Sequence, residues 1–152
     1  MDLRSELVAP AVPTARLEEL SREIERISEL ARRGERTGAE DAVEAFNEET
    51  GHQYVLLDFV DHGGWRSLED FAREAARPAW PKVPDITRDE LVELVRRILT
   101  ADPEAEYYTR LLQVNVPHPR VTDMIFHPPA ELLNASAEDI VDAALRYRAI
   151  VV

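Results

Sequence analysis

Apolar residues spaced three and four positions apart recur along most of this 152-residue chain. Such spacing puts one apolar stripe on a helix, and a repeated stripe is typical of helices that pack on a core. At four places the stripe follows a Ser or Thr with an acidic residue three positions later, the pattern of a capping box. The predicted helix starts are Thr37, Ser67, Thr87 and Ser136. We therefore predict an all-α fold.

Residues 1–84 are predicted to form a helical N-terminal region. Its first helix ends at Gly34, and the second runs from Thr37 to Gly51 with Val43 and Phe46 on one face, so the two should form a hairpin. The stripe of the first helix consists of Leu17, Leu20, Ile24, Ile27 and Leu30. A third helix should follow Ser67 and end before Pro78.

Between the second and third helices the sequence leaves the structure open. The run "QYVLLDFV" at 53–60 fits either one strand or a short buried helix. A single strand would have no pairing partner here, which favours a helix or a turn. The "DHGGW" that follows at 61–65 predicts a flexible turn, because its glycines lack the context of a phosphate-binding loop.

A proline-rich linker at 78–84 separates this region from the rest of the chain. Prolines 78, 81 and 84 fix φ and keep the preceding residues out of helical conformation, so we expect an extended segment and a boundary near residue 84. Trp80 lies within this linker. Because tryptophan is usually buried, we expect Trp80 to attach the linker to a core; the alternative is that it serves as a binding platform.

Residues 85–152 read as three longer helices around one short segment. The first helix should begin after Thr87 and direct five residues inward. The second helix should begin at Pro103 and bury Tyr107 or Tyr108. The third helix should begin after Ser136. The five inward residues of the first are Leu91, Leu94, Val95, Ile98 and Leu99. The short segment, "HPRVTDMIFHP" at 118–128, has a histidine and a proline at each end.

This region resembles the immunity proteins of the DNase colicins and related pyocins, small four-helix proteins that inactivate a cytotoxic nuclease. "ITRDELVELVRRILTAD" is similar to the first helix of the family, "HPRVTDMIFHP" to its "HPSGSDLIYYP" signature, and "IVDAALRYRA" to its last helix. The resemblance covers about residues 86–152, and residues 1–84 have no equivalent in the family. It implies an immunity-protein-like four-helix unit at 85–152, preceded by an additional helical region.

The resemblance also implies which residues bind a partner. In the family, a third helix of one turn presents a Ser-Asp pair and two tyrosines to the nuclease, and the second helix adds acidic side chains. The matching positions here are Glu104, Glu106, Thr122, Asp123, Phe126, His127 and Pro128. At 126 and 127 this chain has Phe and His in place of the two tyrosines.

The short segment also makes sense from its residues alone. A helix of one turn is too short to be stable in isolation, so it depends on its surroundings. Thr122 suits the N-cap of such a turn, and Asp123 suits the positive end of its dipole. Met124 and Ile125 should then face inward, while Asp123, Phe126 and His127 face outward.

Charge limits the class of partner. With 30 acidic and 18 basic residues the net charge is −12, and residues 85–152 contribute −5 from 12 acids and 7 arginines. An acidic chain lacks the basic footprint needed to bind nucleic acid directly, so the charge favours a basic protein partner or none; the simpler interpretation is that the excess of carboxylates only keeps the protein soluble and monomeric. The absence of cysteine and of a long apolar stretch predicts a cytoplasmic protein without disulfides or membrane spans. The oligomeric state is left open.

No arrangement of residues predicts catalysis. His118, Asp123 and His127 form a conceivable metal-ligand set, but their spacing matches no standard site and a proline follows each histidine. Surface or capping roles suit these histidines better. The chain has no phosphate loop and no nucleophile elbow. We expect no enzyme activity, no metal and no cofactor.

Two functions fit these observations. The first is a bacteriocin-immunity-like protein that neutralises a toxin, in the family a nuclease, by protein-protein contact. The alternative is a non-catalytic interaction or scaffold protein that reuses the helical fold and binds its partner through the N-terminal helices. A metal-dependent enzyme remains a minor third alternative. An exposed Phe126 favours the first function, and a buried one favours the second.

Overall fold

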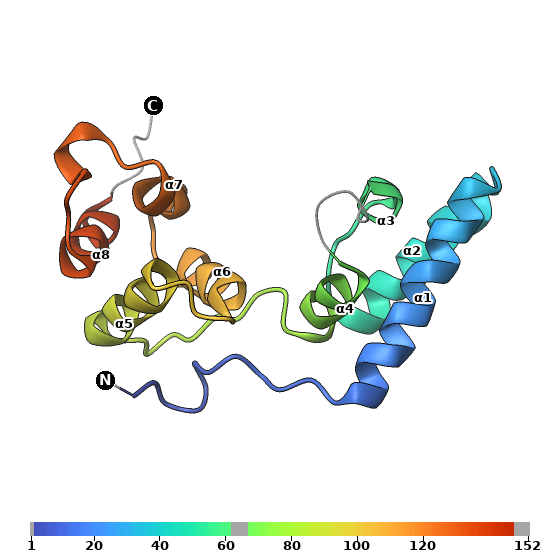
Figure 1. Cartoon of the computed structure of the whole chain (residues 1–152), viewed down its shortest axis with the longest axis horizontal. Helices are drawn as coiled ribbons and strands as arrows, with labels where there is room; N and C mark the ends of the chain where they lie inside the picture. The colour runs from blue at the N-terminus through green and yellow to red at the C-terminus, as the bar shows by residue number, and fades with distance from the viewer. Residues whose placement is uncertain (1, 62–66, 148–152) are drawn as a thin grey trace. The chain divides into compact units, whose positions relative to one another are not determined.

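The computed structural model describes residues 2–61 and 67–147, and every regular element within these ranges is a helix (Figure 1). The all-α prediction is confirmed. The elements are α1 (Thr14–Arg32), α2 (Arg36–Thr50), α3 (Leu56–Asp61), α4 (Leu68–Ala76), α5 (Arg88–Leu99), α6 (Ala105–Asn115), α7 (Val121–Phe126), the 3-10 helix η2 (Ala130–Leu132) and α8 (Ala137–Arg146). Apart from Asp61, the turn predicted at 61–65 lies outside the described residues.

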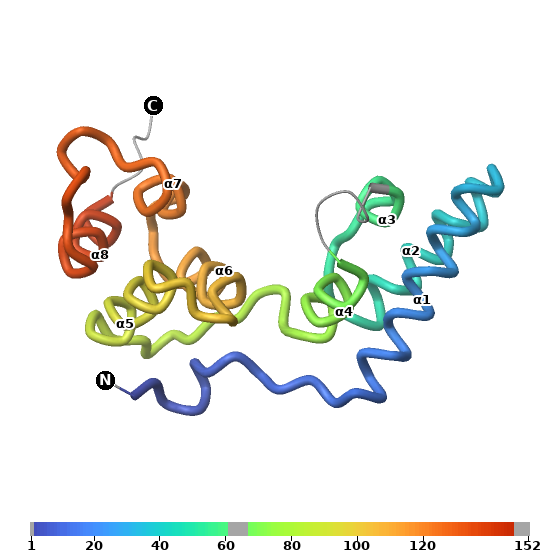
Figure 2. The backbone as a smooth tube through the Cα atoms, viewed as in Figure 1, coloured from blue at the N-terminus to red at the C-terminus, as the bar shows by residue number. Residues whose placement is uncertain are grey.

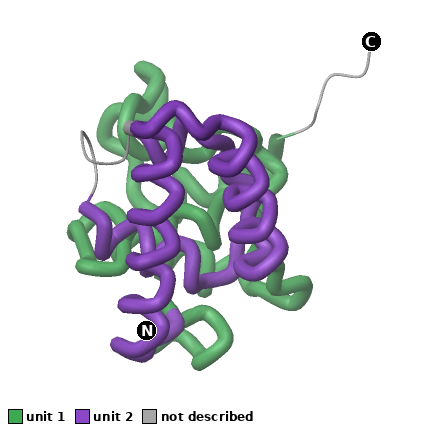
Figure 3. The backbone as a smooth tube through the Cα atoms, turned by 90° about the vertical axis from the view of Figure 1, so that its right-hand side faces the viewer, with its two compact units in different colours: residues 1–9, 80–152 green, residues 10–79 purple. Residues whose placement is uncertain are grey.

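The chain divides into two compact units (Figure 3). The C-terminal unit comprises Met1–Ala9 and Trp80–Val152, and the N-terminal unit comprises Pro10–Ala79. The backbone trace in Figure 2 starts in the C-terminal unit, forms the N-terminal unit and then returns. Residues 1–9 were expected to belong with the N-terminal helices, whereas the structure groups them with the other unit, because Leu3 and Leu7 are buried in its core.

In the N-terminal unit, α1 packs against α2, α3 and α4. The core is aromatic: the Phe46 and Phe59 rings lie 5.3 Å apart at nearly right angles, and the Phe59 and Phe71 rings lie 5.1 Å apart. The Phe46–Phe59 pair is edge-to-face, and contacts of this kind stabilise a core beyond the area that they bury. Residues 53–60, expected as a helix or a turn, enter this core through α3, which buries Phe59 completely.

The connection between α1 and α2 shows why the predicted start at Thr37 is wrong. Gly34 adopts a φ of +77°, its N–H donates to the Ala31 carbonyl, and the Glu35 N–H donates to the Leu30 carbonyl. These two bonds form a Schellman motif. The residue that completes the motif, Glu35, is also the N-cap of α2, so Thr37 already lies inside the first helical turn. The predicted caps at Ser67, Thr87 and Ser136 are confirmed.

Replacing Ser67 by alanine should lower the free energy of unfolding of the N-terminal unit by about 1 kcal/mol, because the Ser67 hydroxyl accepts the Asp70 N–H at the start of α4. Thr37→Ala, in the same unit, should change it by less than about 0.5 kcal/mol, because Thr37 caps no helix. Urea denaturation followed by circular dichroism measures both. Equal losses in the two variants would contradict the assignment of the caps.

In the C-terminal unit, α5 packs against both α6 and α8, and α7 contacts α6 and α8. The core includes the inward residues of α5 and α6, with both Tyr107 and Tyr108 buried. Two sequence predictions fail at helix ends. Leu99 is half exposed at the end of α5, and Val92 is buried instead. Helix α6 begins at Ala105 rather than Pro103, because the Asp102 side chain accepts the Glu104 N–H and holds Pro103 in a turn.

The proline-rich linker is not helical, but it bends at Ala79 and Trp80 instead of running extended, and the Lys82 N–H donates to the Trp80 carbonyl at 2.8 Å. It is also not attached through its tryptophan. Trp80 is 72% exposed, and Pro81 is buried in its place. The attachment is polar: Asn115 at the end of α6 accepts the Val83 N–H at 2.9 Å and donates to the Pro81 carbonyl at 3.0 Å. Since one amide side chain satisfies both backbone groups, the tryptophan ring is not needed for the attachment.

Candidate partner-binding face

Helix α7 is a six-residue helix between Pro119 and Pro128. Its N-cap is Arg120, so the prediction that Thr122 caps it is wrong: Thr122 lies within the first turn. The entry to the helix is ordered by His118, whose Nδ1 accepts the Arg120 N–H at 3.0 Å and whose ring contacts the Tyr147 ring at 4.7 Å. His118 therefore orders the turn that precedes α7, and no side-chain hydrogen bond caps the helix itself.

The apolar side chains of α7 divide into two groups. Val121, Met124 and Ile125 are spaced by three and four residues and are buried in the core of the C-terminal unit. Phe126 is 55% exposed, on the outward face. The predicted orientation of this segment, with Met124 and Ile125 inward and Asp123, Phe126 and His127 outward, is confirmed. Burial of the inward group holds a helix that is too short to form alone.

The contact between α6 and α7 fixes which residues share a surface. Gln113 on α6 donates from Nε2 to the Thr122 hydroxyl at 3.0 Å, which places α7 beside the C-terminal half of α6. Gln113 is exposed and was not predicted as a site residue. Gln113 stands seven residues, or two helical turns, after Glu106 on the same stripe of α6. This spacing could have identified it as a residue of the same surface.

The structure does not place all seven predicted residues together. Thr122, Asp123, Phe126, His127 and Pro128 lie on or directly after α7. Glu104, the N-cap, and Glu106 lie at the other end of α6, and at 1.5 Å per residue Glu106 is roughly 10 Å along the helix from Gln113. Glu106, Arg110 and Gln113 follow one side of α6 toward α7, whereas Glu104, the N-cap of α6, does not lie on this stripe. We call this stripe together with the outward side of α7 the α6/α7 face.

The charge on the α6/α7 face is mixed. Its acidic groups are Glu106 and Asp123, and the Asp123 carboxylate makes no ion pair within the described residues. Arg110 on the stripe and Arg120 before α7 add cations. The face therefore offers an exposed aromatic ring beside one carboxylate, rather than a continuous acidic surface.

The helices behind the face are joined by ion pairs. Arg88 of α5 donates from Nε and Nη2 to the two carboxylate oxygens of Asp142 on α8, at 2.7 and 3.0 Å. The hydrogen bonds from Arg88 hold the pKa of the Asp142 carboxyl below its ordinary value. Arg96 of α5 and Glu138 of α8 form a second pair. Two-point contacts of this kind fix the geometry between helices, so α7 is presented on a defined support.

Within residues 2–61 and 67–147 no three side chains of the metal-binding types come together. His118, Asp123 and His127 are accordingly not grouped as a ligand set there: the His118 Nδ1 accepts a backbone N–H, and Asp123 and His127 are exposed. In the same ranges no helix combines the length and the apolar character needed to cross a membrane.

Comparisons with known proteins agree with this architecture. Residues 83–150 match the family described as colicin immunity protein / pyocin immunity protein. No curated protein and no solved structure matches the chain significantly. The matched region begins in the linker and contains α5 to α8, and it leaves out both the N-terminal unit and residues 2–9. The resemblance predicted from the sequence is therefore confirmed for the C-terminal region: residues 83–150 match the colicin and pyocin immunity protein family.

Proposed function

We propose that this protein neutralises a toxin by binding it through the α6/α7 face, without catalysis. The family match supports a toxin-binding role for the C-terminal region. The observation that carries the proposal is the exposure of Phe126 on a helix whose other apolar side chains are all buried. An exposed aromatic ring on a fixed support is the usual form of an interface anchor.

Each residue of the face has a distinct role in this proposal. Phe126 fills an apolar pocket of the toxin, and the Asp123 carboxylate accepts hydrogen bonds from a cation or from backbone amides beside that pocket. His127 and Pro128 extend the contact at the end of α7. Thr122 and Gln113, hydrogen-bonded to each other, hold α7 in register with α6. Glu104 and Glu106 lie on the rim of the contact, where charges affect association more than affinity.

The toxin in this proposal is a basic protein domain, and a nuclease is the class that the family resemblance implies. The net charge of −12 attracts a basic surface over distances of about a Debye length, roughly 10 Å at 0.1 M salt. Steering of this kind raises the association rate and is weakened by added salt. The short-range contacts at α7 then determine how slowly the complex dissociates.

Asp123→Asn should weaken the complex by about 1.5–3 kcal/mol, since it removes a charged hydrogen-bond acceptor without changing the shape of the side chain. The measurement is titration calorimetry with the protein that co-purifies with the tagged chain from its native host. Asp41→Asn on the exposed side of α2 is the matched control, because it removes the same charge in the N-terminal unit and not on the α6/α7 face. Equal losses for both variants would mean that only total charge matters and that α7 makes no contact.

A second candidate function rests on a different surface. Helix α3 and the residue before it leave Val55, Leu57 and Val60 exposed in the N-terminal unit. Three exposed aliphatic side chains on such a short segment fit the alternative in which the N-terminal helices bind the partner. The family match does not extend to this unit, so the α6/α7 face remains the better supported site.

A further inference from the structure

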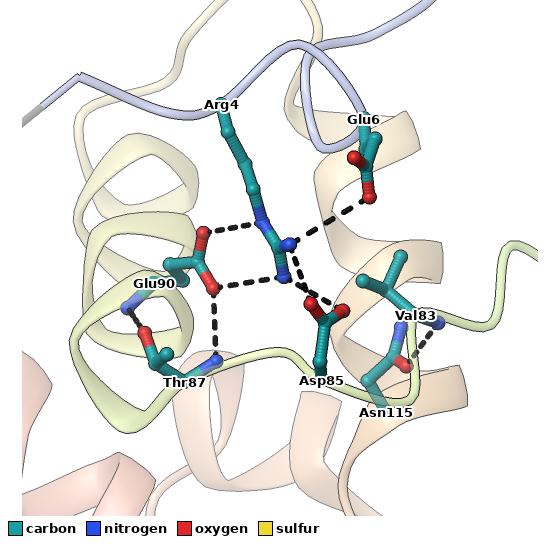
Figure 4. Close-up of polar contacts among 7 residues, drawn as sticks. All are labelled: Arg4, Glu6, Val83, Asp85, Thr87, Glu90 and Asn115. Atoms are coloured by element: carbon teal, nitrogen blue, oxygen red, sulfur yellow. Dashed lines mark hydrogen bonds and ion pairs between the residues drawn. The ribbon is translucent and has the colours of Figure 1, made fainter.

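Residues 2–9 cross from the start of the chain to the surface of α5 and contribute to the core of the C-terminal unit (Figure 4). We call this segment the strap. Leu7 is completely buried and Leu3 nearly so, whereas Val8 beside it is 42% exposed. The strap lies outside the region that matches the immunity protein family, so the core of this unit depends on a segment from the other end of the chain.

A single arginine makes the polar attachment of the strap. Arg4 donates to both carboxylate oxygens of Glu90, at 2.8 and 3.2 Å, and to both of Asp85, at 2.9 and 3.1 Å (Figure 4). Two carboxylates arranged around one planar guanidinium use its fixed donor geometry in a way that lysine could not. Arg4 thereby joins the strap to the end of the linker and to the first turn of α5.

Glu90 is a nearly buried carboxylate in this arrangement. It also accepts the Thr87 N–H at 2.9 Å as part of the capping box of α5. Burial acts to raise the pKa of the Glu90 carboxyl, but the Thr87 N–H and the Arg4 guanidinium outweigh this effect and lower it. The carboxylate is therefore charged at neutral pH, and Arg4 is its cation.

The backbone of the strap contributes little to the attachment. Its one loop hydrogen bond runs from the Leu7 N–H to the Arg4 carbonyl, within the strap itself. Within the described ranges, no backbone hydrogen bond joins residues 2–9 to α5 or α6. Two buried leucines, the partly buried Ala9 and one guanidinium thus keep eight residues ordered, and the conformational entropy that these residues regain on release opposes this order. Segments with so few attachments open at lower free energy than the core that they cover.

We call the contacts of Arg4 with Asp85 and Glu90 the latch. We propose that the strap is a releasable element: the latch contacts break, and Leu3 and Leu7 leave the core while α5 to α8 stay folded. Release uncovers an apolar surface flanked by the carboxylates of Asp85 and Glu90. Before release, this surface is covered by the strap itself. In Figure 1 the strap and α7 lie on opposite sides of the α5 and α6 pair, so the strap does not cover α7. The proposal therefore stands or falls independently of toxin binding.

The chain contains no cysteine, so a single introduced thiol reports the opening of its own site. Three full-length variants serve as reporters: Leu7→Cys in the strap, Val8→Cys as the exposed reference, and Val95→Cys in the fully buried core of α5. With a small thiol reagent, Leu7→Cys should react at least about tenfold more slowly than Val8→Cys and at least about tenfold faster than Val95→Cys. Leu3→Cys supplies a second strap reporter in case Leu7→Cys does not fold.

Opening the latch by mutation should act on the strap alone. Arg4→Gln should speed labelling of Leu7→Cys by about tenfold and leave Val95→Cys unchanged, because it removes the charged contacts to both carboxylates. Arg16→Gln is the matched control, since Arg16 makes ion pairs of 2.8 Å with Glu19 and Glu49 in the N-terminal unit. It should change neither rate.

Three results would overturn the proposal. Equal rates for Leu7→Cys and Val95→Cys would show that the strap leaves only when the whole unit unfolds. A rate for Leu7→Cys equal to that of Val8→Cys would show that the strap is not bound in solution. Equal acceleration of Leu7→Cys by Arg4→Gln and Arg16→Gln would show that Arg4 is not the latch.

Discussion

Phe126→Ala should weaken the complex between this protein and its toxin by at least ~2 kcal/mol, or about 30-fold in Kd. The ring is 55% exposed on α7, so a partner that covers it removes a large apolar area from water. The loss should appear mainly as faster dissociation, because the substitution leaves the charges that steer association in place. Calorimetry and stopped-flow kinetics with the co-purified partner measure the two effects.

The same substitution should leave the fold intact. Phe126 faces outward, so its removal opens no cavity, and the thermal unfolding midpoint should stay within the error of the measurement. Leu99→Ala is the matched control, because Leu99 is a similarly exposed apolar residue and is the last residue of α5. Binding that is unchanged in Phe126→Ala, or reduced equally in Leu99→Ala, would rule out Phe126 as the anchor.

The orientation of Phe126 was predictable because its causes are local. Prolines on both sides limit α7 to one or two turns, and the spacing of Val121, Met124 and Ile125 selects the inward side. The caps at Ser67, Thr87 and Ser136 were predictable for the same reason, since each bond joins residues three positions apart. Thr37 has the same local pattern, but the Schellman motif that ends α1 reaches Glu35 and starts α2 first.

The features that the sequence did not predict depend on contacts between distant residues. Arg4 and Glu90 are 86 positions apart, and nothing in "DLRSELVA" indicates that Leu3 and Leu7 complete the core of a unit at the other end of the chain. The exposure of Trp80 depends likewise on Asn115, which holds the linker by its backbone. Composition and periodicity carry no information about such pairings, so only the three-dimensional structure reveals them.

The candidate site was predictable in part. Position-by-position similarity to the family identified the residues of α7, and their exposure agrees with that expectation. It did not identify Gln113, whose bond to Thr122 positions the helix. It also grouped Glu104 and Glu106 with α7, although the rise of α6 separates them by two turns or more. Spacing along one helix was readable from the sequence, whereas the position at which a second helix meets it was not.

Phe46→Ala should separate the two candidate functions, because it damages the N-terminal unit and leaves the α6/α7 face untouched. Phe46 is almost fully buried and contacts the rings of Tyr54, Phe59 and Phe71. Removing a buried phenylalanine costs about 3–5 kcal/mol, a large part of the roughly 5–15 kcal/mol that stabilises a typical domain. Hydrogen exchange should therefore rise across Pro10–Ala79 and stay unchanged in α5 to α8.

If the α6/α7 face binds the toxin, Phe46→Ala should change the binding free energy by less than about 0.5 kcal/mol, because the substitution destabilises the unit that does not carry this face. Phe126→Ala should give the opposite pair of results, with the fold intact and binding lost, so each variant is the control for the other. If Val55, Leu57 and Val60 bind the partner instead, Phe46→Ala should abolish binding, since α3 packs on the damaged core. That outcome, with exchange in α5 to α8 unchanged, would move the partner site to the N-terminal unit and leave the immunity-like unit with a structural role.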